Sequence, residues 1–232
     1  MNLAILLAAG SGNRMQGAVT DKVLTKVVGK AVLQYSLEAF AESSVIDHTC
    51  IVCRDDPQKR EIESILSESD TPITELSYCF GGKERSDSVM NALQAAPSGC
   101  SFVFIHDAAR PLVSSASIQK LEIAVRKDQA AVLAHQVTDT IKRIPEANTL
   151  SKLSFEDLDR KRLWAMETPQ AFAYEPIFTA YQRITTEGLA ITDDCAAASI
   201  AGLGITIVEN DLPNPKLTTA ADLDYLNWLL QR

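Results

Sequence analysis

A turn of small residues and glycines follows the first apolar run of this 232-residue chain. It consists of Ala8, Ala9, Gly10, Ser11 and Gly12. Glycine adopts backbone conformations that are closed to other residues, and small side chains let backbone amides approach a ligand closely. Exposed amides of this kind form anion sites. On its own the turn leaves two interpretations open: an anion site, or a tight structural turn between a strand and a helix.

Two cations stand just beyond this turn. Arg14 supplies a forked, permanent charge and Lys22 a compact one, a pair that suits a triphosphate better than a dinucleotide. The dinucleotide fingerprint fails because Met15 stands where its third glycine belongs. A Walker loop fails as well, because no Gly-Lys-Ser/Thr sequence follows the turn. We therefore expect the turn to hold a nucleoside triphosphate.

A second loop of similar composition follows a later apolar run. Gly81 and Gly82 open it, and Arg85 and Ser88 follow at an expected helix start. One loop of this kind indicates little beyond helix capping. Two of them at the carboxyl ends of strands in one sheet indicate a shared ligand site.

A carboxylate and a guanidinium follow a third apolar run. Asp107 and Arg110 come directly after His106 and just before Pro111. One interpretation is a local salt bridge, which contributes little free energy if it is exposed. The other is that Asp107 binds Mg²⁺ or orders a substrate hydroxyl, because Mg²⁺ binds nucleotides through few carboxylates and several phosphate oxygens.

Short apolar runs alternate with amphipathic segments along the chain. Strands are predicted at 3–8, 48–53, 75–79, 102–106, 130–135 and 205–208, and helices at 32–40, 58–66, 88–95, 117–125 and 221–230. This alternation predicts right-handed crossovers and a mostly parallel sheet covered on both faces. The expected fold class is therefore α/β, a Rossmann-like three-layer αβα sandwich forming a single domain over residues 1–232. Ligands of such sheets bind beyond the carboxyl ends of the strands.

The alternation breaks between about residues 137 and 163, where the sequence is polar and has no clear helical stripe. We expect an arm that leaves the core. A lid, a disordered loop and a dimerisation hairpin all fit such a segment, and long irregular segments in compact domains are usually functional.

Composition excludes several classes of protein. The net charge of −8 argues against a nucleic-acid binder, although a small anion needs only a local basic pocket. No apolar run approaches the roughly 20 residues of a membrane span. Five cysteines without a secretion signal favour reduced thiols and a cytoplasmic protein. Cys50 and Cys53, three apart on a predicted strand, are expected to face opposite sides of the sheet as small buried hydrophobes.

Seven segments, taken in order, resemble those of the 2-C-methyl-D-erythritol 4-phosphate cytidylyltransferases of the non-mevalonate isoprenoid pathway. They are residues 8–15, 81–89, 106–111, 139–142, 168–172, 192–194 and 214–218. The set is specific although no single piece is, and it spans nearly the whole chain. The resemblance implies a nucleotide-diphospho-sugar-transferase-like fold and the transfer of a cytidylyl group from CTP to methylerythritol phosphate, with release of pyrophosphate and with Mg²⁺ as cofactor.

The resemblance also implies a role for each candidate residue. The glycine turn, Arg14 and Lys22 would bind the phosphates of CTP, and Lys216 would join Lys22 near the α-phosphate. Residues around the cytosine and ribose would be Gly82, Arg85 and Ser88. Residues handling methylerythritol phosphate would be Asp107, Arg110, Thr140, Arg160 and Thr168. Thr140 and Arg160 would come from an arm exchanged between the subunits of a homodimer.

Two positions depart from the pattern of that family. Asp21 precedes Lys22 where a proline is usual, and the separation between Gly10 and Lys22 is longer than in common members. Lys83 occupies a position that is often acidic, which bears on recognition of the base.

Other functions stay open at this point. The closest is a cytidylyltransferase that acts on ribitol 5-phosphate or a similar polyol phosphate, since the same phosphate cradle would serve both. One from a different class is a catalytically silent nucleotide-binding protein, and a dehydrogenase is a third.

Overall fold

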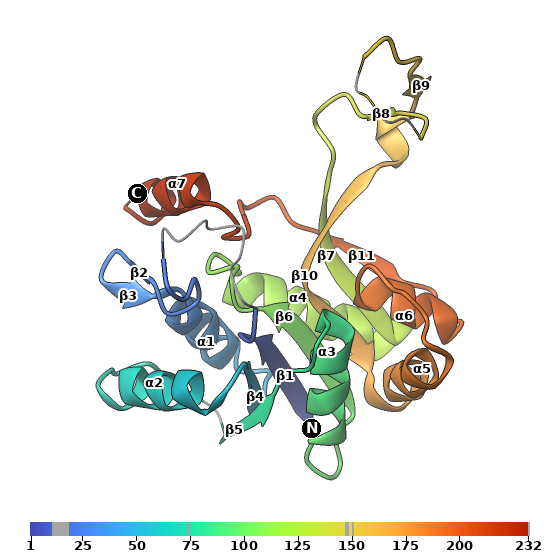
Figure 1. Ribbon diagram of the computed structural model, residues 1–232. Helices are drawn as coiled ribbons and strands as arrows, with labels where there is room; N and C mark the ends of the chain where they lie inside the picture. The colour runs from blue at the N-terminus through green and yellow to red at the C-terminus, as the bar shows by residue number, and fades with distance from the viewer. Residues whose placement is uncertain (11–18, 74, 147–148, 150, 232) are drawn as a thin grey trace.

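The computed structural model describes residues 1–10, 19–73, 75–146, 149 and 151–231. In this part of the chain one sheet has seven strands, in the order β11-β7-β10-β6-β1-β4-β5 (Figure 1). Its strands are β1 (Asn2–Leu7), β4 (His48–Cys53), β5 (Glu75–Phe80), β6 (Phe102–Asp107), β7 (Ala130–Gln136), β10 (Trp164–Ala173) and β11 (Thr206–Glu209). All neighbours pair in parallel except β10, which is antiparallel to both β6 and β7. The expected mostly parallel sheet is confirmed.

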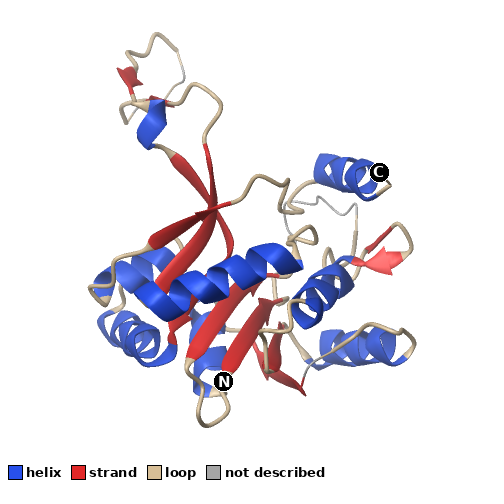
Figure 2. Cartoon of the chain, turned by 180° about the vertical axis from the view of Figure 1, so that it is seen from behind, coloured by secondary structure: helices blue, strands red, loops and turns tan. Residues whose placement is uncertain are grey.

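Helices cover both faces of this sheet (Figures 1 and 2). They are α1 (Val32–Glu42), α2 (Asp56–Ser67), α3 (Arg85–Gln94), α4 (Ser115–Asp128), α5 (Tyr174–Glu187) and α6 (Asp194–Ile200). A further helix, α7 (Ala220–Leu230), lies to one side of the sheet (Figure 1). Among the described residues, no helix is long and apolar enough to span a membrane.

The central strands supply both halves of the core. On β1, Ala4 and Leu6 pack in the cluster that contains residues of α1 and α4, and Leu3 and Ile5 pack in the cluster with residues of α3 and α5. A strand buried on both faces therefore has a continuous apolar sequence, which is why β1 could be recognised. Cys50 and Cys53 fall in opposite clusters, as expected.

Every predicted strand and helix is present, with ends shifted by a few residues. Outside the arm, the described elements without a sequence prediction are β10, α5, α6 and the small hairpin of β2 (Lys26–Val27) and β3 (Lys30–Ala31). β10 contains Pro169 and a register shift between Met166 and Gln170. Proline and an irregular register both hide the alternating pattern by which a strand is recognised.

An arm leaves the body of the molecule between β7 and β10 (Figure 1). It carries the two-stranded sheet of β8 (Lys142–Arg143) and β9 (Glu156–Asp157), followed by a 3₁₀ turn, η2 (Arg160–Arg162). Ile141, Ile144 and Phe155 are exposed on it. The excursion begins and ends close to the limits expected from the sequence.

Candidate active site

A cavity of about 610 Å³ lies past the carboxyl ends of β1, β4, β5 and β6. Among the described residues that line it, the cationic ones are Lys22, Arg54, Lys83, Arg85 and Lys216, whereas the acidic ones are Glu84 and Asp107. In a chain of net charge −8 this is a local excess of positive charge. A low-dielectric cleft lined by one sign of charge attracts the opposite sign. The cavity therefore suits an anionic ligand.

Most residues predicted for nucleotide binding meet at this cavity. Those that line it are Ala9, Gly10, Lys22, Gly82, Arg85, Ser88 and Lys216, and Asp107, which was predicted for the substrate or a metal ion, lines it too. The predicted Ser11, Gly12 and Arg14 lie outside the described residues. Ala8 is buried behind the lining, and its amide donates to the carbonyl of Val52 at 3.0 Å, so the amide extends the sheet in this structure.

Close packing explains the glycines of the second loop. A Cβ on Gly81 would lie 2.7 Å from the Cβ of Ala9 and 2.9 Å from Ser88 Oγ. A Cβ on Gly82 would lie 2.2 Å from that of Asp87. Ser88 Oγ accepts from the Gly82 amide at 3.1 Å and so fixes the loop over the start of α3. The two glycine-containing loops thus lie against each other, although β4 separates the strands β1 and β5 that they follow.

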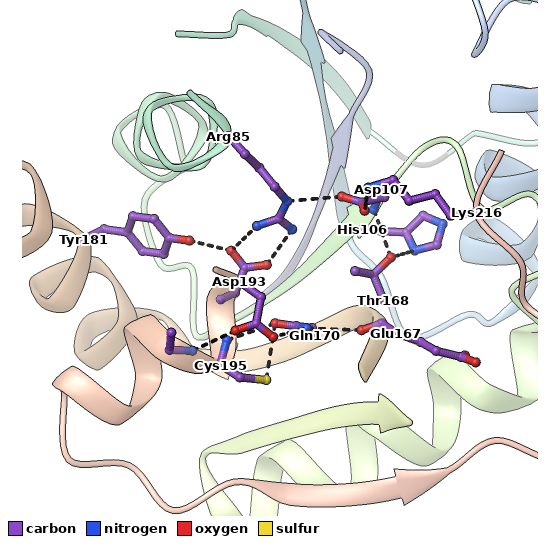
Figure 3. A network of polar contacts seen from close by, with 12 residues as sticks. Arg85, His106, Asp107, Glu167, Thr168, Gln170, Tyr181, Asp193, Cys195 and Lys216 are labelled. Carbon is purple, nitrogen blue, oxygen red and sulfur yellow. Dashed lines mark hydrogen bonds and ion pairs between the residues drawn. The ribbon is translucent and has the colours of Figure 1, made fainter. Parts of the chain in front are cut away.

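Asp107 joins three parts of the site at the end of β6. Its Oδ1 is 3.3 Å from Arg85 Nε, and its Oδ2 is 2.5 Å from Lys216 Nζ (Figure 3). Burial alone would raise the pKa of this carboxyl group, but Arg85 and Lys216 outweigh it and hold the pKa well below its usual range. Asp107 is therefore ionised, and it holds both cations at the cavity wall.

Arg85 is held from its other side by a buried carboxylate. Its Nη1 and Nη2 donate to the two carboxylate oxygens of Asp194 at 2.8 and 2.7 Å. Asp194 is 0% exposed, and Tyr181 donates its hydroxyl to Asp194 Oδ1 at 2.5 Å. Burial of the guanidinium opposes its charge, yet Asp194 and Asp107 raise the pKa of Arg85 above its usual range. A bidentate pair of this geometry fixes the orientation of Arg85.

The predicted substrate residue Thr168 belongs to a chain of hydrogen bonds behind Asp107. The Asp107 amide donates to Thr168 Oγ1 at 3.0 Å, and this hydroxyl lies 3.0 Å from His106 Nδ1. His106 Nε2 lies 3.1 Å from the Arg110 carbonyl. All of these groups have partners if the Thr168 hydroxyl donates to His106 Nδ1 and His106 Nε2–H donates to the Arg110 carbonyl. The ring then carries one proton and is neutral. Burial accordingly lowers the pKa of His106 to about 4.

Arg110 lies at a second cavity of about 510 Å³ rather than at the first. Its Nη1 donates to the Asn214 carbonyl at 2.6 Å, whereas its buried Nε has no hydrogen-bond partner within the described chain. Burial lowers the pKa of Arg110 from its usual value. Asp107 at the first cavity and Arg110 at the second are joined by a short turn, in which the Arg110 amide donates to the Asp107 carbonyl at 2.9 Å.

Glu167 ties the loop that carries Lys216 to the sheet. This buried carboxylate accepts from Asn210 Nδ2 at 2.8 Å and from Asn214 Nδ2 at 3.0 Å, and it lies 2.7 Å from His135 Nδ1. Asn214 also donates to the Thr168 carbonyl at 3.0 Å. The position of Lys216 thus depends on contacts two residues earlier in its loop.

The remaining predicted residues lie on the arm. Thr140 and Arg160 line neither of these two cavities, and both are exposed. Arg160 Nη1 donates to the Thr138 carbonyl at 2.7 Å, which is a contact within the arm.

Sequence reasoning missed three residues of this site. Arg54 follows β4 directly and lines the first cavity, so the rule that loops after strands carry ligands would have found it. Asp194 lies in one of the segments that resembled the family, but no role was assigned to it. Glu167 gave no signal, because its side-chain partners lie 32 to 47 residues away along the chain.

Comparisons with known proteins identify the family of this chain. The family model for IspD, 2-C-methyl-D-erythritol 4-phosphate cytidylyltransferase, matches residues 2–232. The chain is 34% identical to the protein of that description from Synechococcus elongatus, over 98% of this chain and 95% of the relative. It is 35% identical to the one from Caldanaerobacter subterraneus, over 99% of this chain and 98% of the relative.

Solved structures give the same result. The 4-diphosphocytidyl-2C-methyl-D-erythritol synthase of Anaerococcus prevotii matches with a TM-score of 0.86 at 28% identity, covering 100% of this chain and 96% of that one. The 2-C-methyl-D-erythritol 4-phosphate cytidylyltransferase of Francisella tularensis matches with a TM-score of 0.78 at 28% identity, covering 98% of both chains. The chain belongs to the family of 2-C-methyl-D-erythritol 4-phosphate cytidylyltransferases.

Proposed function

We propose that this chain transfers the cytidylyl group of CTP to 2-C-methyl-D-erythritol 4-phosphate and releases pyrophosphate. The observation that carries the proposal is the cationic cavity past the carboxyl ends of the strands, in which Asp107 holds Arg85 and Lys216. A phosphate oxygen of the acceptor attacks the α-phosphorus of CTP and forms a new P–O bond. The bond from the α-phosphorus to the oxygen that bridges it to the β-phosphorus breaks, and the electron pair leaves with pyrophosphate.

The chemistry needs charge neutralisation more than proton transfer. The acceptor phosphate is already anionic, so no side chain has to remove a proton from it. The neutral and fully buried His106 fits this, because its role is structural. Two anions have to be brought together, and negative charge on the α-phosphate oxygens has to be stabilised in the transition state. We assign this work to Lys22 and Lys216, together with Arg14.

The nucleotide lies, on this proposal, against both glycine-containing loops, which line the same cavity. The amides of Ala9, Gly10 and the residues that follow, including Ser11 and Gly12, would face the phosphates. Gly82 and Ser88 would lie near the ribose and base, because they line the same cavity around the start of α3. Arg85 is already bound to two carboxylates, so we assign it the shaping of this wall rather than a free charge for the ligand.

Magnesium fits the site as an ion carried by the nucleotide. Among the described residues, no group of three or more His, Cys, Asp or Glu side chains could hold a metal ion. Asp107 is ionised and lines the cavity, so it can supply one carboxylate while phosphate oxygens supply other ligands. When bound there, the ion would neutralise phosphate charge and orient the triphosphate.

The acceptor would bind beside Asp107 and Arg110, with Thr168 holding Asp107 from behind. We propose that Thr140 and Arg160 complete this subsite from the arm of a second copy, in a homodimer of single-domain subunits. Exposed Ile141, Ile144 and Phe155 support a contact on the arm, since apolar side chains gathered on a projecting segment mark interaction sites.

Mixing two inactive variants tests the exchanged arm. If each arm completes the partner's site, Lys216→Ala and Arg160→Ala subunits form hybrid dimers in which one site has both defects and the other has neither. Random reassortment should then restore about a quarter of wild-type turnover. Pyrophosphate release would be measured before and after subunit exchange, with each variant alone as its control. No recovery in a mixture shown by mass spectrometry to contain hybrids would contradict the exchanged arm.

A substrate panel tests the reaction itself. Each of the four nucleoside triphosphates would be offered with methylerythritol phosphate or ribitol 5-phosphate, and pyrophosphate release would be followed with Mg²⁺ present. We expect the highest kcat/KM for CTP with methylerythritol phosphate. Preference for ribitol 5-phosphate would establish the other cytidylyltransferase, and saturable CTP binding without release would establish a silent nucleotide-binding protein.

A further inference from the structure

Asp21, which stands beside the cavity lysine Lys22, is the centre of a cluster of buried contacts. The side chain of Asp21 is 8% exposed. Its Oδ1 accepts from the Val23 amide at 3.1 Å, and its Oδ2 accepts from Gln58 Nε2 at 2.7 Å. Arg54 Nη1 lies 3.2 Å from the same Oδ2. A carboxylate with this many donors is fixed in place, and it fixes the backbone that carries it.

Gln58 extends these contacts to two strands of the sheet. It lies in the first turn of α2 and is 2% exposed. Its Nε2 also donates to the Ala8 carbonyl at 3.1 Å, at the end of β1, and its Oε1 accepts from the Arg54 amide at 2.6 Å, at the end of β4. Through Gln58, Asp21 is therefore bound to the end of β1, which the glycine turn follows, and to the end of its neighbour β4.

Lys22 reaches the glycine turn from this anchored backbone. A Cβ placed on Gly10 would lie 3.8 Å from Lys22 Nζ. A lysine side chain has four rotatable bonds and is flexible. The position of its ammonium group therefore depends on where its backbone is held. Lys22 and Arg54 line the same cavity. The negative charge of Asp21, which pairs with Arg54 and is adjacent to Lys22 in the chain, offsets the repulsion between these two cations.

We infer that Asp21 is a positioning residue, which holds Lys22 at the phosphate end of the nucleotide cavity by binding Gln58 and Arg54. This inference rests on the proposed function, because it assumes that the triphosphate binds beside Lys22. A carboxylate that bonds to three neighbouring groups restricts the backbone before the lysine, as a proline would restrict it through its ring.

The test is binding of CTP with Mg²⁺ by isothermal titration calorimetry. Asp21→Asn keeps the size of the side chain but places an amide where donors from Gln58 and Arg54 now converge. We expect the Kd for CTP to rise about tenfold, comparable to the loss of a hydrogen bond to a charged group. Lys22→Ala should raise it by at least as much. In the Lys22→Ala background, Asp21→Asn should add less than about a twofold change, because residues that act through one another are not additive.

Asp55→Asn is the matched control. Asp55 forms the other ion pair of Arg54, 3.1 Å from its Nε, and caps α2 by accepting from the Gln58 amide. Asparagine caps helices as well as aspartate does, so this variant removes a carboxylate from Arg54 and leaves the contacts of Asp21 intact. We expect its Kd for CTP to stay within about twofold of the wild-type value. Should Asp21→Asn fail to fold, Gln58→Met breaks the same contacts from α2 and should raise the Kd in the same direction.

The outcomes separate this inference from the proposed function. Wild-type protein that neither binds CTP nor releases pyrophosphate would overturn the proposed function. Wild-type binding and turnover, with an unchanged Kd in a folded Asp21→Asn variant, would overturn only the role of Asp21. An equal effect of Asp21→Asn with and without Lys22 would also overturn it, because Asp21 would then act by another route.

Discussion

Lys216→Ala is expected to lower kcat by about 10²- to 10³-fold, the usual loss when one electrostatic donor to a transition state is removed. Lys216 Nζ lies 2.5 Å from Asp107 at the wall of the nucleotide cavity. Its loop is held by Asn214, which donates to Glu167 and Thr168, and by the Leu217 amide, which donates to the Ala109 carbonyl at 2.8 Å. The ammonium group is thus preorganised, and such a group stabilises developing charge without a cost of reorganisation.

Pyrophosphate release at saturating CTP and acceptor measures this effect. Lys127→Ala is the control, since Lys127 is an exposed residue of α4 and lines neither of the two cavities described. The Lys216→Ala protein should remain folded, because Asp107 keeps its ion pair with Arg85. A kcat within a few-fold of the wild-type value would show that Lys216 does not act on the transition state.

The strands and helices of the first half of the fold were predictable because each has its own periodic signal. β1 and β4 are buried on both faces, and each contains a short apolar run, residues 3–7 and 50–53. β10 carries Glu167, Thr168 and Pro169 in the middle of the sheet, so its sequence does not resemble a strand. These polar residues lie in the core because they hold other residues of the site in place. The hydrophobic pattern of a short segment does not predict a strand where function requires buried polar groups.

Many residues that line the cavity could be predicted from the sequence, but the contacts between them could not. The glycines, cations and Asp107 follow strands, and a parallel sheet brings such loops together. Nothing local indicated that Arg85 would pair with Asp194, 109 residues away, or that Gln58 would bind Asp21. These contacts depend on the packing of α3 and α6 against α5 and of α2 against β4, which no short window of sequence contains.

Arg85→Leu is expected to lower the free energy of unfolding by about 3–5 kcal/mol, the usual cost of breaking a buried ion pair from one side. The reason is that the variant removes a cation from two carboxylates and keeps both carboxylates in place. Asp194 is 0% exposed and would keep Tyr181 as a hydrogen-bond donor, but it would lose both bonds from the guanidinium. Asp107 would lose one of its two cations and keep Lys216. Urea denaturation at neutral pH measures the change.

A second substitution shows whether the stranded charge causes the loss. Asp194→Asn in the Arg85→Leu background removes the charge and keeps an oxygen for the Tyr181 hydroxyl, so the double variant should be more stable than Arg85→Leu alone. Arg183→Leu is the matched control, because Arg183 forms an exposed pair with Glu187 on α5. Exposed pairs contribute about 0–1 kcal/mol, and the control should change stability by no more than that. If Arg85→Leu and Arg183→Leu had equal effects, the pair between Arg85 and Asp194 would not hold α3 to α6.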